Sequence, residues 1–176
     1  MYDIKDLIGY LYIVREKIRS EDKKGLWDYY CPQIRNTEHN IEEWEKRHNI
    51  CLPESYRNFL LAANGWKCVC QDRDLFSLEE LSLSNDNQYI ETRDFCKDNL
   101  LNTGNKELLL PIGGSEYSYD IFLLVLDSNC DYFGQVLWVA GEEIERYQGF
   151  EEFFLSIIQH NKYNYKLLTG KEYPEK

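Results

Sequence analysis

Residues 50–65 read ICLPESYRNFLLAANG, and this stretch predicts a helix with a defined start, a buried side and a defined end. Pro53 suits the first helical position, where its missing N–H costs nothing. Asn64-Gly65 supplies residue types that tolerate the left-handed conformation common at helix ends. Between them, the apolar residues recur at i, i+3, i+4 and i+7 and so form one stripe: Tyr56, Phe59, Leu60 and Ala63.

Helical spacing also predicts elements on both sides of this stretch. An N-terminal amphipathic helix is expected over residues 3–20, and a short helix, IEEWEKRH, is expected after Asn40 as its cap. A closing helix follows Gly149, and a tail is expected from about residue 163. The apolar face of the closing helix contains Phe150, Phe153, Phe154, Ile157 and Ile158.

Strand-like runs lie between the helices. WKCVCQ predicts a short strand, and LFSLEEL predicts a short strand that leads into a turn. LLLPIGGS, YDIFLLVLD and GQVLWVAG are apolar runs bounded by Gly, Asp and Asn. The turn-rich DSNCDYFG predicts an antiparallel hairpin over residues 119–140. Residues 84–106 are polar, with a helix expected over 92–101. This order predicts one α+β domain over residues 1–176, with a mostly antiparallel or mixed sheet packed against helices.

The charge is large and uneven. The 176 residues carry a net charge of −11, yet residues 1–71 hold equal numbers of acids and bases. Residues 107–152 hold ten acids and a single base, Arg146. Such a distribution indicates a directional negative field that repels nucleic acid and membranes and attracts basic partners. A merely solvated acidic surface is the alternative.

Location and metal content are predicted from what the sequence lacks. The N-terminus has no signal-peptide pattern, and no run approaches the length of a membrane span, so a cytoplasmic protein is expected. The six cysteines are then expected to stay reduced. They show no CxxC or knuckle spacing and there are only three histidines, so no metal and no cofactor is predicted.

Catalytic motifs are also missing. The chain has no GxSxG, HExxH, GxxxxGK[ST] or GxGxxG. Gly113-Gly114-Ser115 is interpreted as a turn rather than a phosphate cradle, because no helix start or lysine follows and the neighbouring residues are acidic. Neighbouring carboxylates are inevitable with 31 acids, so none is read as a catalytic pair. The chain is predicted not to be an enzyme, with no catalytic residue.

The ordered set of motifs resembles the SUKH superfamily, with its Smi/Knr-type domain. IEEWEKRHNICLPESYRNFLLAANG is similar to the family pattern of a short acidic helix, Leu-Pro, a Tyr-Arg-x-Phe-Leu helix and Asn-Gly. LPIG, GQVLWV and FEEFF follow in family order, so the resemblance covers about residues 40–160. Ser118-Tyr119-Asp120 stands where the family often has Gly-Asp. The matching positions are Leu52, Pro53, Tyr56, Arg57, Phe59, Leu60, Asn64 and Gly65.

This resemblance implies a single-domain α+β fold and a protein that works by binding. Bacterial members of the family are mostly immunity proteins that bind and block a cognate toxin, whereas fungal and viral relatives serve as interaction modules. The chain is therefore expected to be an immunity protein whose partner is a toxin, with a basic nuclease domain as the expected type. A non-catalytic interaction or regulatory module is the alternative.

Candidate partner-binding residues are those where acids alternate with aromatics, since Tyr and Trp anchor interfaces and charges steer association. Two stretches fit, and two further acids lie in the polar segment. The first stretch contains Glu116, Tyr117, Tyr119 and Asp120, and the second contains Asp127, Asp131, Tyr132 and Phe133. The further acids are Asp94 and Asp98. For each tyrosine, half-buried sheet packing is the alternative role.

Overall fold

The computed structural model describes residues 3–81 and 108–174. In these residues a six-stranded sheet has the order β1-β2-β3-β4-β5-β6, and every neighbouring pair is antiparallel. The sheet is therefore a meander, which confirms the α+β prediction and its antiparallel alternative. The strands are β1 (Trp66–Cys70), β2 (Arg73–Leu75), β3 (Leu109–Ser115), β4 (Ile121–Val125), β5 (Val136–Val139) and β6 (Glu143–Tyr147).

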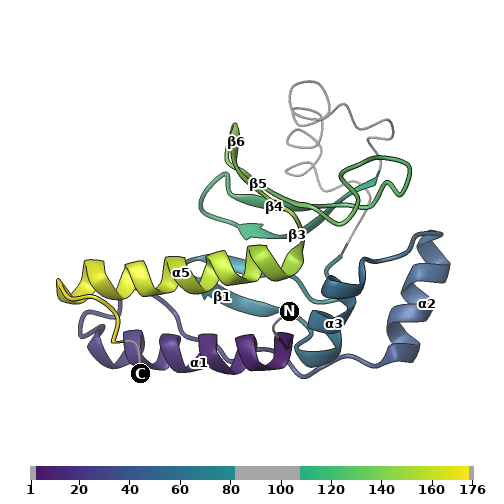
Figure 1. Cartoon of the computed structure of the whole chain (residues 1–176). Coiled ribbons are helices and arrows are strands. Elements are labelled where there is room, and N and C mark those ends of the chain that lie inside the picture. Colours follow the sequence, from purple (N-terminus) through teal and green to yellow (C-terminus); the bar gives the residue numbers. More distant parts are fainter. Residues whose placement is uncertain (1–2, 82–107, 175–176) are drawn as a thin grey trace.

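The helices of the described part are α1 (Ile4–Glu21), α2 (Glu38–His48), α3 (Glu54–Ala62) and α5 (Phe150–Thr169). Helices α1 and α5 lie side by side and start at the same end, with α3 next to the start of α1 and α2 at the outer side (Figure 1). Arg15 of α1 connects α1 and α5 to the sheet. Its guanidinium donates to the carbonyl of Val69 on β1 at 3.0 Å and contacts Asn161 Oδ1 on α5 at 3.5 Å.

The main core lies between the helices and one face of the sheet. Aromatic rings from α3 and α5 form its centre: Tyr56, Phe59, Phe150, Phe153 and Phe154. Strands β3–β5 add Leu110, Ile112, Phe122, Leu124, Val136 and Trp138. Full burial of one such side chain contributes about 1.5–3 kcal/mol. The predicted stripe of residues 56–63 is thus the helical side of this core.

Strands β3–β5 bury their second face as well, which explains why they read as continuous apolar runs. A separate cluster on these strands contains Leu109, Ile121, Leu123, Val125, Leu137 and Val139. Because side chains alternate between the two faces of a strand, Leu123 belongs to this cluster while its neighbours Phe122 and Leu124 belong to the main core.

Several element boundaries differ from the prediction. Thr37, not Asn40, caps α2: its Oγ1 accepts from the Asn40 N–H at 3.2 Å, which places Asn40 inside the first turn. Pro53 is the cap residue of α3 rather than its first residue. The α3 helix ends at Ala62, and Gly65 takes the left-handed conformation expected for the end of the segment, with φ +91°.

The closing helix and the last strand also extend the prediction. Helix α5 continues to Thr169, past the expected start of a tail at about 163. Asn164 and Tyr165 in this last part of the helix are still buried against the rest of the fold. Strand β6 was not predicted, since EIERY is mostly charged and only Tyr147 is buried. Charges are typical of an edge strand, where they discourage pairing with another chain. The helix expected over 92–101 lies outside the described residues.

Candidate partner-binding surface

Strand topology separates the two predicted stretches. In the meander, the β1–β2, β3–β4 and β5–β6 turns lie at one edge of the sheet, and the β4–β5 loop lies at the opposite edge (Figure 1). We call the first the turn edge; it contains residues 71–72, 116–120 and 140–142. Neighbouring turns on it are two strand spacings apart, or about 10 Å. Glu116 to Asp120 lie on the turn edge, whereas Asp131 and Phe133 lie in the β4–β5 loop, so the two stretches are at opposite edges of the sheet.

The β3–β4 turn carries the most exposed aromatic side chains of the described residues. Tyr117 is 87% exposed and Tyr119 is 86% exposed, and Glu116 is exposed beside them. Their backbone is held from below: Ser115 Oγ accepts from the Tyr117 N–H at 3.0 Å and from the Ser118 N–H at 3.1 Å. The alternative role of half-buried packing is therefore wrong for both tyrosines.

Asp120, predicted as a contact residue, instead belongs to the support of this turn. It is buried, and its Oδ1 accepts from the indole Nε1 of Trp138 at 2.5 Å. Its Oδ2 accepts from Ser118 Oγ at 2.5 Å and lies 3.2 Å from Arg73 Nε. Burial raises the pKa of the Asp120 carboxyl, but these hydrogen bonds and the guanidinium outweigh it, so its pKa is lower than usual.

Two further residues of this support come from distant parts of the sequence. The Arg73 guanidinium lies over the Trp138 ring at 4.9 Å. The ring of His160 on α5 lies 5.0 Å from the same indole. Asp72 in the β1–β2 turn accepts from Ser115 Oγ. Sequence reasoning missed Arg73 and Trp138, because no local pattern relates β2, β5 and the β3–β4 turn.

The β5–β6 turn adds a carboxylate to the same edge. Gly141 has φ +76° and the Ala140 N–H donates to the Glu142 carbonyl at 2.9 Å, leaving the Glu142 side chain exposed. Glu143 behind it is neutralised, because Arg146 donates to it from Nε at 3.0 Å and from Nη2 at 2.7 Å.

At the opposite edge, the second predicted stretch divides into buried and exposed members. Asp127 is buried and accepts from the Asn129 N–H at 2.9 Å, so it shapes the loop. Asp131 is exposed, and Tyr132 is half-buried with Arg146 over its ring at 5.2 Å. Phe133 is 40% exposed. Asp94 and Asp98 lie outside the described residues.

Phe133 lines a groove of about 940 Å³ at this opposite edge. The groove lies where the N-terminal residues of α1, α3 and α5 converge, and its wall carries both signs of charge. Its charged residues are Asp3, Lys5, Arg35, Glu38, Glu54 and Glu151. It is thus a surface of mixed charge.

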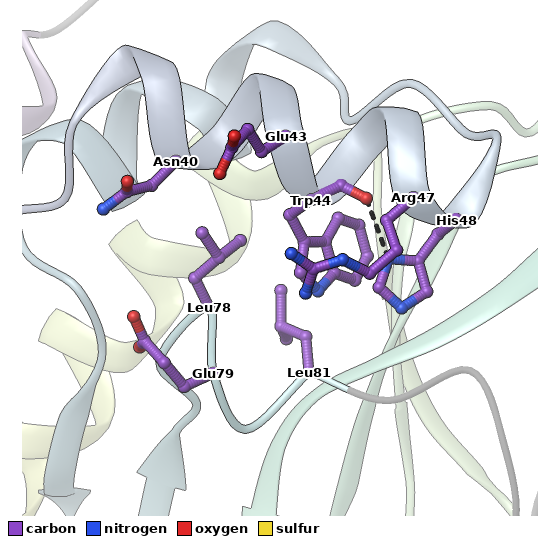
Figure 2. A pocket seen from close by; sticks show the side chains of 8 residues that line it. All are labelled: Asn40, Glu43, Trp44, Arg47, His48, Leu78, Glu79 and Leu81. Carbon is purple, nitrogen blue, oxygen red and sulfur yellow. Dashed lines mark hydrogen bonds between the residues drawn. The ribbon is translucent and has the colours of Figure 1, made fainter.

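A second groove, of about 500 Å³, lies between α2 and the chain after β2 (Figure 2). Trp44, Leu78 and Leu81 give it an apolar floor, and a polar rim surrounds them. His48 lies in it as a half-buried helix residue: its ring stacks on Trp44 at 4.2 Å and its Nδ1 lies 2.8 Å from the Trp44 carbonyl. The rim consists of Asn40, Glu43, Arg47 and Glu79.

The family-like positions of the Leu-Pro and Tyr-Arg helix are structural. Arg57 joins α3 to α2 by pairing with Glu45 and Glu38. Asn64 Oδ1 accepts from the Leu78 N–H at 2.9 Å. A Cβ at Gly65 would lie 2.6 Å from the Ser77 nitrogen, so only glycine fits there. Leu52, Tyr56, Phe59 and Leu60 are core residues.

Residues 3–81 and 108–174 contain neither a cluster of metal ligands nor a helix suited to a membrane. In these ranges no group of three His, Cys, Asp or Glu side chains is arranged to hold a metal ion. Within the same ranges, no helix combines the length and apolar character that crossing a bilayer requires.

The fold therefore defines an α+β domain in which an antiparallel meander is covered by helices. The model of the SMI1 / KNR4 family (SUKH-1) matches residues 35–156. Because that match spans well over half of the chain, the chain belongs to the SMI1/KNR4 family, which confirms the predicted resemblance. The family is associated with immunity proteins of toxin systems and is generally non-catalytic. Comparison with curated proteins gave no significant match.

Proposed function

We propose that this chain is a cytoplasmic immunity protein that binds a cognate toxin domain and neutralises it. The observation that carries the proposal is the family match over residues 35–156, since the family is associated with immunity proteins of toxin systems. The function then requires a surface for a protein partner rather than a pocket for chemistry.

The charge distribution favours a nuclease as the type of toxin. Nuclease active sites are basic because they bind phosphate groups, and an acidic inhibitor can occupy such a site in place of nucleic acid. Ten acids against one base in residues 107–152 give this chain the required field. The same field opposes direct binding of nucleic acid, so the proposed partner is a protein.

Co-expression tests the proposal. Cells produce the toxin domain that we expect the neighbouring gene to encode, with or without the chain, and survival and co-purification are scored. Survival together with a stable one-to-one complex is the expected result. Death without a complex would contradict the immunity function and favour the alternative, a module that recruits a different protein without inhibiting an enzyme.

A further inference from the structure

We infer that the turn edge is the surface that docks on the partner, with Tyr117 and Tyr119 as aromatic anchors and a basic protein surface as the occupant. This inference rests on the function proposed above and specifies where the binding occurs. Its basis is the exposure of the two tyrosines, the hydrogen bonds that fix their turn, and the charges around them.

These tyrosines contribute little to the packing of the described residues. Tyr117 and Tyr119 are 87% and 86% exposed, whereas the next most exposed aromatic among the described residues, Tyr163, is 56% exposed. Tyrosine offers a large amphipathic contact area with few rotatable bonds, so it loses little entropy on binding. Buried aromatic anchors of this kind supply much of the binding energy at protein interfaces.

The turn is also organised before binding. Ser115 Oγ holds the backbone N–H groups of Tyr117 and Ser118, and Asp120 fixes the far end of the turn to Trp138 on β5. A surface that already has its bound conformation avoids the ordering cost that a loose loop would add to association.

The charges on the turn edge select a basic partner. Asp72, Glu116 and Glu142 lie on three successive turns of this edge, about 10 Å from one turn to the next. Arg73 at this edge and Arg146 farther along β6 are both paired with carboxylates of the chain itself. A partner with Lys and Arg around an apolar recess complements this arrangement, and a phosphate backbone does not.

The groove at the opposite edge fits the same partner less well. Lys5 and Arg35 line it together with acids, so it offers no single sign of charge. The N-termini of α1, α3 and α5 also converge there, and the positive ends of helix dipoles favour anions rather than a basic surface. Phe133 is the exposed aromatic of that groove and therefore provides a matched control.

The experiment measures the affinity of the toxin domain that we expect the neighbouring gene to encode for purified variants of the full chain. The test variant is Tyr117→Ala/Tyr119→Ala, and the controls are Phe133→Ala and Tyr30→Ala, the latter 53% exposed and located beside Trp66, away from the turn edge. Thermal unfolding confirms that each variant is folded. We expect the double variant to bind at least about 100-fold more weakly and each control to bind within about threefold of the wild type.

Each outcome has one meaning. If the wild type binds and the double tyrosine variant binds within about threefold of it, the turn-edge assignment is overturned, but the immunity function still stands. Loss of affinity in Phe133→Ala alone moves the interface to the groove and likewise overturns the assignment. A wild-type chain that does not bind the toxin domain overturns the proposed function, and the turn-edge assignment fails with it.

Discussion

The indole N–H of Trp138 donates to the Asp120 carboxylate at 2.5 Å, and this bond connects strand β5 to the base of the turn that carries Tyr117 and Tyr119. Asp120 also accepts a hydrogen bond from Ser118 Oγ and lies beside the Arg73 guanidinium. The carboxylate that the sequence marks as a contact residue thus acts indirectly, by holding the exposed residues in place.

Asp120→Asn tests this relationship through stability. The amide keeps the size of the side chain but removes the charge that pairs with Arg73, and hydrogen bonds to charged groups contribute about 1.5–3 kcal/mol. We expect the free energy of unfolding, measured with urea, to fall by about 1–3 kcal/mol. The control Asp131→Asn changes an exposed carboxylate and is expected to stay within about 0.5 kcal/mol. Equal effects of the two substitutions would refute the supporting role of Asp120.

The same pair predicts a pH dependence. Because the pKa of Asp120 is lower in the folded chain than its usual value, the ionised carboxylate stabilises the fold above the unfolded pKa of about 3.9. That contribution is lost as the pH falls through the folded pKa. The stability difference between wild type and Asp120→Asn is expected to be full at about pH 6 and to shrink below about pH 4. A difference that grows on acidification would have the wrong sign.

Tyr56→Phe is expected to leave the protein as stable as before or slightly more stable. Among the described residues, no hydrogen-bond partner is found for the fully buried Tyr56 hydroxyl. Leaving a buried hydroxyl unpaired costs about 1–3 kcal/mol, which phenylalanine avoids. Tyr56→Ala, which also removes the ring packed on Phe150, is expected to cost about 3–5 kcal/mol. Thermal unfolding of both variants measures the two effects, and a large loss in Tyr56→Phe would show that the hydroxyl has a partner.

The Arg57–Glu45 pair is expected to couple α2 to α3. Arg57 pairs with Glu45, and Glu45 Oε1 also accepts from the Leu52 N–H at 2.7 Å, just before α3. A double-mutant cycle with Arg57→Ala and Glu45→Ala measures the coupling in urea unfolding. We expect about 1 kcal/mol or more, because both side chains are largely shielded from solvent. A coupling energy near zero would mean that the pair contributes nothing to stability.

Association with a basic toxin domain is expected to slow as salt rises. Exposed charges steer encounter over a distance that screening limits to about 10 Å at 0.1 M ionic strength. Stopped-flow measurements of the association rate constant check this, with Glu116→Gln/Glu142→Gln as the variant that weakens the salt dependence. A rate constant that does not change with salt would remove the electrostatic part of the proposal while leaving the family assignment intact.

Much of the fold can be predicted from the sequence because its main signals are local. The apolar stripe of residues 56–63, the closing aromatic helix and the β4–β5 hairpin all follow from spacing and turn residues. Strand β6 escapes this reasoning because its charged residues occupy an edge strand, where packing provides little pattern. The end of α5 could not be predicted, because a polar residue such as Asn164 gives no sign in the sequence that it is buried.

The candidate surface is less predictable, because exposure and neighbourhood depend on the tertiary fold. The alternation of acids and tyrosines marks Tyr117 and Tyr119, which lie exposed in the fold, but it cannot distinguish exposed Glu116 from buried Asp120. Nor can it show that Asp72 and Glu142 lie at the same edge, since strand order alone brings these turns together.

Titration of toxin activity with the purified chain tests the central claim most directly. The toxin domain that we expect the neighbouring gene to encode is assayed on nucleic acid while the chain is added in increasing amounts. We predict that activity falls to background at one equivalent of the chain and that the double tyrosine variant requires a large excess. Full activity in the presence of excess wild-type chain would contradict the account.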